Sequence, residues 1–256
     1  GRTPEGVFYY AMEYLDGIDL DRLVRDHGPQ PPARVIRILQ QVCGALAEAH
    51  GIGLIHRDVK PANIILCERG GEPDVAKVVD FGLVKRIDAL EEEATQVVTA
   101  GITLLGTPLY IAPETISGRD DADGRADLYA LGAVGYYLLT GTPVFTGKTV
   151  VEVLAHHLHT RPQPPSERAA ATIPGDLERL ILECLAKSPD DRPRDARSLE
   201  RELAVCAART PWPRDQAVAW WAAFRQAHPS AHARAVPEPM RVTAEVDLAG
   251  RLSGPR

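Results

Sequence analysis

The sequence has few cysteines and no long apolar segment. Its four cysteines, Cys43, Cys67, Cys184 and Cys206, lie far apart and form no C-x-x-C pair. This spacing favours buried thiols in a reducing compartment over a zinc site or a disulfide framework. The longest apolar stretch, Leu128–Leu139, is interrupted by two glycines and is shorter than the roughly 20 residues that span a bilayer. With no signal-peptide pattern either, we expect a cytoplasmic protein.

An excess of positive charge is also absent. The net charge is −6, with 45% hydrophobic and 25% charged residues, as in an ordinary globular protein. This mild acidity argues against nucleic acid as a partner, because phosphate backbones select basic surfaces. The 256 residues suffice for one large domain or two modest ones.

Apolar periodicity predicts mostly helices. Spacing of the i, i+3, i+4 type begins at Leu20 and stops at Gly28. A second helix is predicted over Pro31–His50, and Asp127–Thr140 is apolar nearly all round, as in a buried helix. Further helices are predicted for a surface segment at 151–158, for the segment after an N-cap at Asp176, from Ala196 onward, and for an aromatic stripe between Pro213 and Pro229.

Only short strands are predicted beside these helices. They cover Val7–Met12, Ile64–Leu66 and Val75–Val79. Residues 83–107 show no period and predict a loop, while the Pro- and Arg-rich residues 229–256 predict disorder. The expected fold class is therefore α+β and helix-dominated.

The stretch HRDVKPANIIL carries the strongest chemical signal. Asp58 stands at its centre, Asn63 follows five positions later, and Asp80 opens a DFG triplet 22 residues after Asp58. A lone loop aspartate would be read as a salt-bridged turn residue, but the joint spacing favours catalysis. Phosphoryl transfer from ATP needs a carboxylate for the accepting hydroxyl and oxygen ligands for Mg²⁺, in this order along protein kinases.

With these motifs, the chain resembles the C-terminal lobe of a bacterial Ser/Thr protein kinase related to eukaryotic kinases, from about Val7 to Arg209. The resemblance implies that Asp58 orients the substrate hydroxyl and accepts its proton. It implies that Asn63 and Asp80 hold Mg²⁺ on ATP, and that Lys60 contacts the γ-phosphate, a mark of Ser/Thr kinases. The implied substrate is a protein, and the implied role is in signalling.

The segment YYAMEYLDGIDL resembles the linker between kinase lobes. The resemblance makes Met12 the gatekeeper and lets backbone groups of Glu13 and Leu15 bond adenine. Asp19 would approach the ribose, and Ile65 would form part of the adenine floor. The simpler alternative is an edge strand that carries an apolar methionine.

The segment Gly106–Glu114, GTPLYIAPE, resembles the peptide-docking part of a kinase. Thr107 would hydrogen-bond the catalytic aspartate and lysine. Glu114 would pair with Arg192 in a structural, buried ion pair, and Asp127 would cap the backbone of the catalytic loop.

The loop at 83–107, within an activation segment 80–114, resembles one controlled by phosphorylation. Arg57 before the catalytic aspartate marks that subclass, and Thr103 sits where the phosphate is usual, with Thr95 and Thr99 as rivals. A phosphate adds about −1.5 to −2 charges and could dock on Arg57. The alternative is an ordinary loop threonine.

Two other features have plainer readings. The Trp220–Trp221 stripe predicts packing against the lobe, with a partner-docking helix as the alternative. His156, His157 and His159 share one helix, but no cysteine or carboxylate at ligand spacing supports a metal site. By these readings residues 1–15 are a remnant of the N-terminal lobe and hinge, 16–209 the C-terminal lobe, 210–228 an accessory helix and 229–256 a tail.

Three parts of a complete kinase are not found in this sequence. There is no Gly-rich loop, no lysine before Lys60, and no helix glutamate upstream to hold one; only Gly1–Gly6 stand before the first strand. Lys77 lies on the strand that leads into DFG. By the resemblance, this is the wrong side of the nucleotide cleft for Lys77 to replace the missing lysine. We therefore expect a fragment or processed product with little activity alone, which needs an N-terminal lobe or a partner chain.

Two other function classes stay open. One is a pseudokinase-like or split-kinase module that docks proteins; the three retained site residues count against it. The other is a small-molecule phosphotransferase with a kinase-like fold; enzymes of that kind usually lack the GTPLYIAPE segment that this chain has.

Overall fold

The computed structural model describes residues 12–81, 108–118 and 123–228. The predicted strand at Val7–Met12, the loop at 83–107 and the tail at 229–256 therefore lie wholly or almost wholly outside the described residues. No helix in the described part is long and apolar enough to cross a membrane. All four cysteines are buried free thiols, as predicted.

Three antiparallel strands form a small sheet in the order β1-β2-β3. The strands are β1 (Gly17–Asp19), β2 (Ile64–Arg69) and β3 (Glu72–Val78). No strand was predicted for the first of these, since three residues are too few to show alternation. Gly17 fits there because a Cβ would lie 2.1 Å from the Leu66 carbonyl oxygen.

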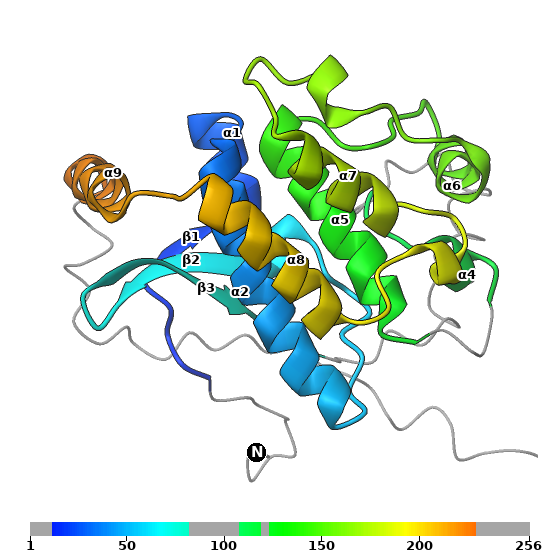
Figure 1. Cartoon of the computed structure of the whole chain (residues 1–256), viewed down its shortest axis with the longest axis horizontal. Helices are drawn as coiled ribbons and strands as arrows, with labels where there is room; N and C mark the ends of the chain where they lie inside the picture. The colour runs from blue at the N-terminus through cyan, green and yellow to red at the C-terminus, as the bar shows by residue number, and fades with distance from the viewer. Residues whose placement is uncertain (1–11, 82–107, 119–122, 229–256) are drawn as a thin grey trace, which may run out of the picture.

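Helices make up most of the rest, so the prediction of a helix-dominated α+β fold is confirmed. Figure 1 shows α2, α5, α7 and α8 side by side, with the sheet, α1 and α9 at one end and α4 and α6 at the other. The bounds are α1 Leu20–His27, α2 Pro32–Gly51, η1 Pro61–Asn63, α4 Pro113–Ile116, α5 Arg125–Thr140, α6 Val150–His159, η2 Pro165–Glu167, α7 Gly175–Cys184, η3 Pro189–Asp191, α8 Ala196–Arg209 and α9 Arg214–Ala227.

Helix α5 is the centre of the core. Nearly every residue of it is buried, as its uniform apolar sequence predicted. The two glycines that interrupt the run permit close packing on α7: a Cβ on Gly132 would lie 2.5 Å from the Cys184 Cβ, and one on Gly135 2.5 Å from the Ile181 Cδ1. Because interiors are close-packed, a methyl group at either position would push the helices apart.

One local prediction was wrong. Asp176 is not an N-cap: α7 starts at Gly175 after Pro174, and Asp176 lies in its first turn, where a carboxylate still favours the helix dipole. The surface helix predicted at 151–158 is present as α6, and it buries Val153 and His157. The sequence gave no sign of a buried histidine there.

Candidate active site

The loop that carries Asp58 is held by a buried carboxylate at the start of α5. Asp127 is 1% exposed and accepts the backbone N–H groups of His56 and Arg57, each at 2.8 Å. It also contacts the His50 ring nitrogen at 2.8 Å. Arg57 has φ +65°, a conformation that non-glycine residues keep only when their surroundings fix it. The contact expected for Asp127 is present and fixes this turn.

The side chains of Lys60 and Asn63 both contact the Asp58 carboxylate. This carboxylate accepts a hydrogen bond from the Lys60 ammonium at 2.8 Å and one from the Asn63 amide nitrogen at 3.0 Å. The same Asn63 nitrogen donates to the Asp58 carbonyl oxygen at 2.8 Å. Asn63 is buried at the end of η1, whereas Asp58 and Lys60 remain partly exposed. The partly exposed Asp58 carboxylate is thus held in one orientation beside the Lys60 ammonium.

The segment that follows β3, Val79–Phe81, is joined to this loop by a backbone hydrogen bond and by the His56 ring. The Val79 N–H donates to the Asn63 carbonyl at 2.9 Å, and the His56 Nε2 lies 3.0 Å from the Val79 carbonyl. The His56 ring packs on Phe81 with centroids 4.6 Å apart. Asp80 itself is exposed with φ +61°.

His56 is a positioning residue that the sequence analysis quoted in the motif but gave no role. Its Nδ1 accepts the Asp58 N–H at 3.2 Å, so the proton sits on Nε2 and points to Val79. One buried ring therefore connects Asp58 to Val79, the residue before Asp80. Its place in the motif was the available signal.

The oxygen atoms left by these contacts suit Mg²⁺. The Asn63 amide nitrogen faces Asp58, which leaves its Oδ1 for a hard cation, and Asp80 offers an exposed carboxylate. No group of three or more His, Cys, Asp or Glu able to hold a metal occurs in the described ranges. A site with two protein ligands fits an ion that arrives bound to phosphates, as Mg²⁺ does.

The expected hinge residues are only partly assembled. Asp19 and Ile65 are paired across β1 and β2, so the predicted ribose and adenine contacts are neighbours. Asp19 also caps α1 by accepting the Arg22 N–H at 2.8 Å. Glu13 pairs with Arg69, and Leu15 is half-buried. Met12 is 78% exposed, so no described residue packs over it as a gatekeeper requires.

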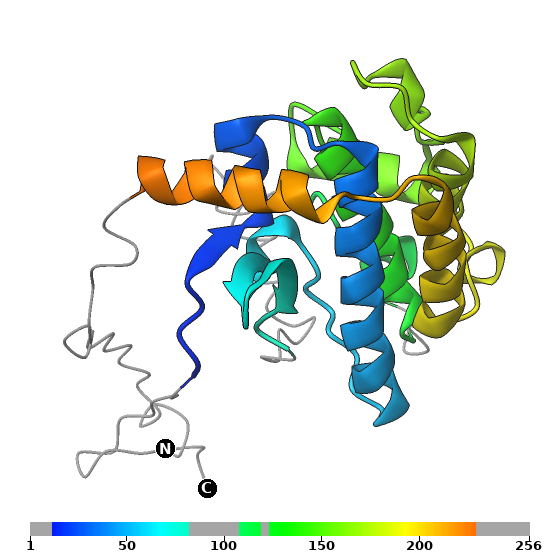
Figure 2. The same cartoon turned by 60° about the vertical axis from the view of Figure 1, so that its left-hand side comes forward.

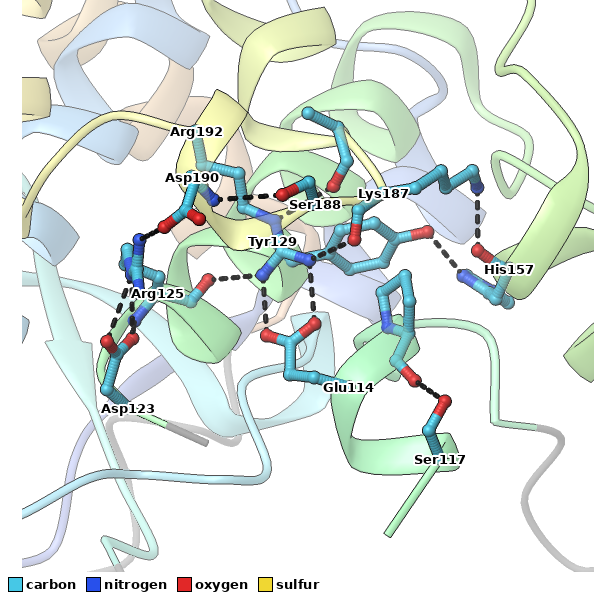
Figure 3. A network of polar contacts seen from close by, with 12 residues as sticks. Glu114, Ser117, Asp123, Arg125, Tyr129, His157, Lys187, Ser188, Asp190 and Arg192 are labelled. Atoms are coloured by element: carbon cyan, nitrogen blue, oxygen red, sulfur yellow. Dashed lines mark hydrogen bonds and ion pairs between the residues drawn. The ribbon is translucent and has the colours of Figure 1, made fainter. Parts of the chain in front are cut away.

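The ion pair expected between Glu114 and Arg192 is present and fully satisfied (Figure 3). The guanidinium donates to both Glu114 oxygens, at 2.6 and 2.7 Å, in a bidentate pair. Its other N–H groups donate to the carbonyls of Ala186, Arg125 and Lys187. The helix α4, which ends the peptide-docking segment, is thereby fixed to the loop before α8.

This pair continues into a second buried cluster (Figure 3). Arg192 lies over the Tyr129 ring at 4.9 Å, and the Tyr129 hydroxyl contacts the His157 Nδ1 at 2.8 Å. Lys187 donates to the His157 carbonyl at 2.7 Å. Burial and the nearby Lys187 charge lower the pKa of His157 to about 4, and burial lowers the pKa of Lys187 to about 8.

Four threonines of the predicted activation and peptide-docking segments were named as candidate regulatory or substrate-contact residues. Thr95, Thr99, Thr103 and Thr107 lie outside the described residues. Arg57, the expected phosphate ligand, is exposed.

The family assignment follows from comparison with known proteins. The protein kinase domain family matches residues 3–203. The chain belongs to this family. The serine/threonine-protein kinase pkn3 of Myxococcus xanthus is 42% identical over 204 residues, which are 79% of this chain and 37% of that protein. PknB of Mycobacterium tuberculosis is 40% identical over 202 residues, 78% of this chain and 31% of that protein. The chain is thus similar to bacterial Ser/Thr kinases of the eukaryotic type and spans about a third of their length.

Solved structures agree with this kinase fold. The kinase domain of M. tuberculosis PknI is 29% identical with a TM-score of 0.55, and the match covers 76% of this chain and 64% of PknI. Rad53 in complex with AMP-PNP is 27% identical with a TM-score of 0.58, covering 75% of this chain and 45% of Rad53. The predicted kinase-like fold is therefore confirmed.

Proposed function

We propose that this kinase chain provides the catalytic-loop side of a Ser/Thr protein kinase site, which transfers the ATP γ-phosphate to protein hydroxyls. The observation that carries the proposal is the contact of Asp58 with Lys60 and Asn63, on a loop fixed by Asp127. Family membership and the similarity to bacterial Ser/Thr kinases support it.

Each residue has a separate task in this proposal. Asp58 orients the substrate hydroxyl and takes its proton, and Lys60 beside it steadies the negative charge of the transferring phosphoryl group. Asn63 and Asp80 would hold the metal. Mg²⁺, when bound, would supply positive charge that offsets the negative charge of the phosphates. Asp19 and Ile65, paired across β1 and β2, are the residues proposed to contact the ribose and the adenine.

We also propose that the 256-residue chain binds Mg-ATP too weakly to work efficiently alone. The sequence contains no G-x-G-x-x-G loop and no lysine before Lys60, parts that grip the nucleotide phosphates in kinases. A polypeptide that also carries an N-terminal lobe is the expected active form.

For the location of the protein we propose the cytoplasm, which the buried free thiols support.

A fusion experiment tests the proposal. The N-terminal lobe of the M. xanthus relative would be joined upstream, and the fusion compared with the present chain. We expect millimolar Mg-ATP to raise the melting temperature of the fusion alone, and the fusion to phosphorylate Ser/Thr peptides. Asp58→Asn in the fusion should keep the melting shift and lower the transfer rate about 10²–10⁴-fold.

Different failures have different meanings. A melting shift for the 256-residue chain by itself would contradict the weak-binding proposal. A fusion that binds Mg-ATP but transfers no phosphate to any peptide would contradict the kinase proposal and favour a protein-docking role.

A further inference from the structure

Helix α9 lies beyond the residues that the kinase family matches, which end at 203. It nonetheless packs on the sheet: Figures 1 and 2 show it beside α1 and the β2–β3 hairpin, and it contacts β3. All three tryptophans of the chain, Trp212, Trp220 and Trp221, lie in α9 or just before it. Two of them enter the hairpin's buried polar centre.

That centre is Asp74, on an irregular stretch of β3. In the β2–β3 register Cys67 faces Val75 and Arg69 faces Glu72, so Pro73 and Asp74 together face the single residue Glu68. Such a β-bulge re-aims a side chain. Asp74 has φ +55° and no exposed surface, and this backbone conformation is stable only where neighbouring groups fix it.

The Asp74 carboxylate accepts four N–H groups from two separate parts of the chain. Arg34 of α2 donates to Oδ2 at 2.9 Å and to Oδ1 at 2.6 Å. The Trp212 indole donates to Oδ2 at 2.8 Å and the Trp221 indole to Oδ1 at 2.9 Å. Each oxygen therefore has one partner from Arg34 and one from a tryptophan.

Arg34 is equally enclosed. It is 1% exposed, donates to the Gln30 side chain at 2.9 Å, and lies 4.1 Å from the centroid of the Trp220 ring. The buried pair is neutral as a unit, so loss of one donor would leave a carboxylate partly unpaired away from water, which is costly. Helix α9 is what completes the set.

Strand β3 also connects Asp74 to the active site. The Gln41 side chain bonds the Asp74 carbonyl at 2.8 Å and the Ala76 N–H at 3.1 Å, so α2 holds β3 on both sides of Val75. The strand then leads to Val79, whose N–H bonds Asn63. In addition, Arg225 in the last turn of α9 pairs with Glu68 of β2, which is a second connection between the helix and the sheet.

We propose that Asp74 is a positioning residue. Through Asp74, helix α9 fixes β3, and with it the following residues Val79 and Asp80, against the catalytic loop. Segment 212–227 is then a working part of the kinase unit rather than a passive appendage. The link to phosphoryl transfer rests on the proposed function; the link between α9 and the strand does not.

The test uses the 256-residue chain and two readouts. Hydrogen exchange at the α9 amides reports whether α9 is docked, because an isolated helix of 14 residues is only marginally stable in water. Hydrogen exchange at the Val79 amide reports the contact with Asn63. Trp212→Phe/Trp221→Phe keeps both aromatic rings but removes both donors; Asp74→Asn changes the acceptor itself. The matched control is Trp220→Phe, since Trp220 packs on Arg34 but does not bond Asp74.

We expect both test variants to speed exchange at the α9 amides and to speed Val79 exchange about tenfold, with α5 amides unchanged. The control should leave Val79 exchange unchanged. The proposal is overturned if α9 exchange speeds up while Val79 exchange stays as in the parent, because α9 then leaves without releasing the strand. It is also overturned if neither test variant speeds α9 exchange, because other contacts then hold α9. If Asp74→Asn does not fold, the tryptophan variant alone decides between these outcomes.

Discussion

Glu114 and Arg192 form two parallel hydrogen bonds of 2.6 and 2.7 Å with both side chains buried. Their positions are far apart in the sequence, one in α4 and the other just after η3. The pair therefore ties α4 to the loop before α8 across 78 residues of sequence. Since every Arg192 N–H has an acceptor, neither charge can lose its partner without a penalty.

Replacement of one partner of this pair should be strongly destabilising. For Glu114→Gln or Arg192→Met we expect the free energy of unfolding to fall by about 3–5 kcal/mol, because the remaining charge stays buried. Urea unfolding followed by circular dichroism measures this. The exposed pair Arg179–Glu183 is the control, and Arg179→Ala should cost roughly 1 kcal/mol or less. Equal losses at the two pairs would contradict the assigned difference.

Asp127 should be needed for the shape of the catalytic loop. Asp127→Asn keeps the size of the side chain but turns one acceptor into a donor, which then faces an N–H of His56 or Arg57. We expect a loss of about 1–3 kcal/mol in stability and faster hydrogen exchange at both loop amides. Asp123→Asn, at an exposed carboxylate near the same helix end, is the control and should leave those amides unchanged.

Local patterns were enough to predict most of the helices. The helix at Leu20, the end at Gly28 and the buried α5 follow from periodicity and turn residues. The contacts of Glu114 and Asp127 came from the family resemblance, because no local pattern links residues so far apart. The Asp74 centre was not foreseen: Arg34, Asp74 and Trp221 are joined by tertiary packing alone. The bulge that aims Asp74 inward reverses what strict alternation would suggest.

Phosphorylation should occur on the predicted activation loop, with Thr103 as the main site. After co-expression of the chain with an active Ser/Thr kinase, phosphopeptide mapping should find Thr103 modified. The exposed Arg57 is the expected ligand of that phosphate, so in the lobe-restored fusion Arg57→Ala should remove the gain in activity that phosphorylation gives. Modification of Thr95 or Thr99 instead, with Thr103 unmodified, would show that the site was misassigned.

The neutral, buried His157 should make the fold sensitive to acid. Its pKa is about 4 in the folded state and about 6.5 in an unfolded chain, so the unfolded chain binds a proton that the folded one does not. The stabilisation is complete above pH 6.5 and is lost as the pH falls toward 4. The full loss would be about 3 kcal/mol.

Chemical unfolding at several pH values checks this. His157→Gln keeps a polar partner for Tyr129 but cannot titrate, so its stability should fall less than the parent's between pH 6.5 and 4. Exposed His159 on the same helix is the control, and His159→Gln should follow the parent curve. If His157→Gln also follows the parent curve, the acid sensitivity arises elsewhere, and His157 does not titrate as its burial against Lys187 and Tyr129 requires.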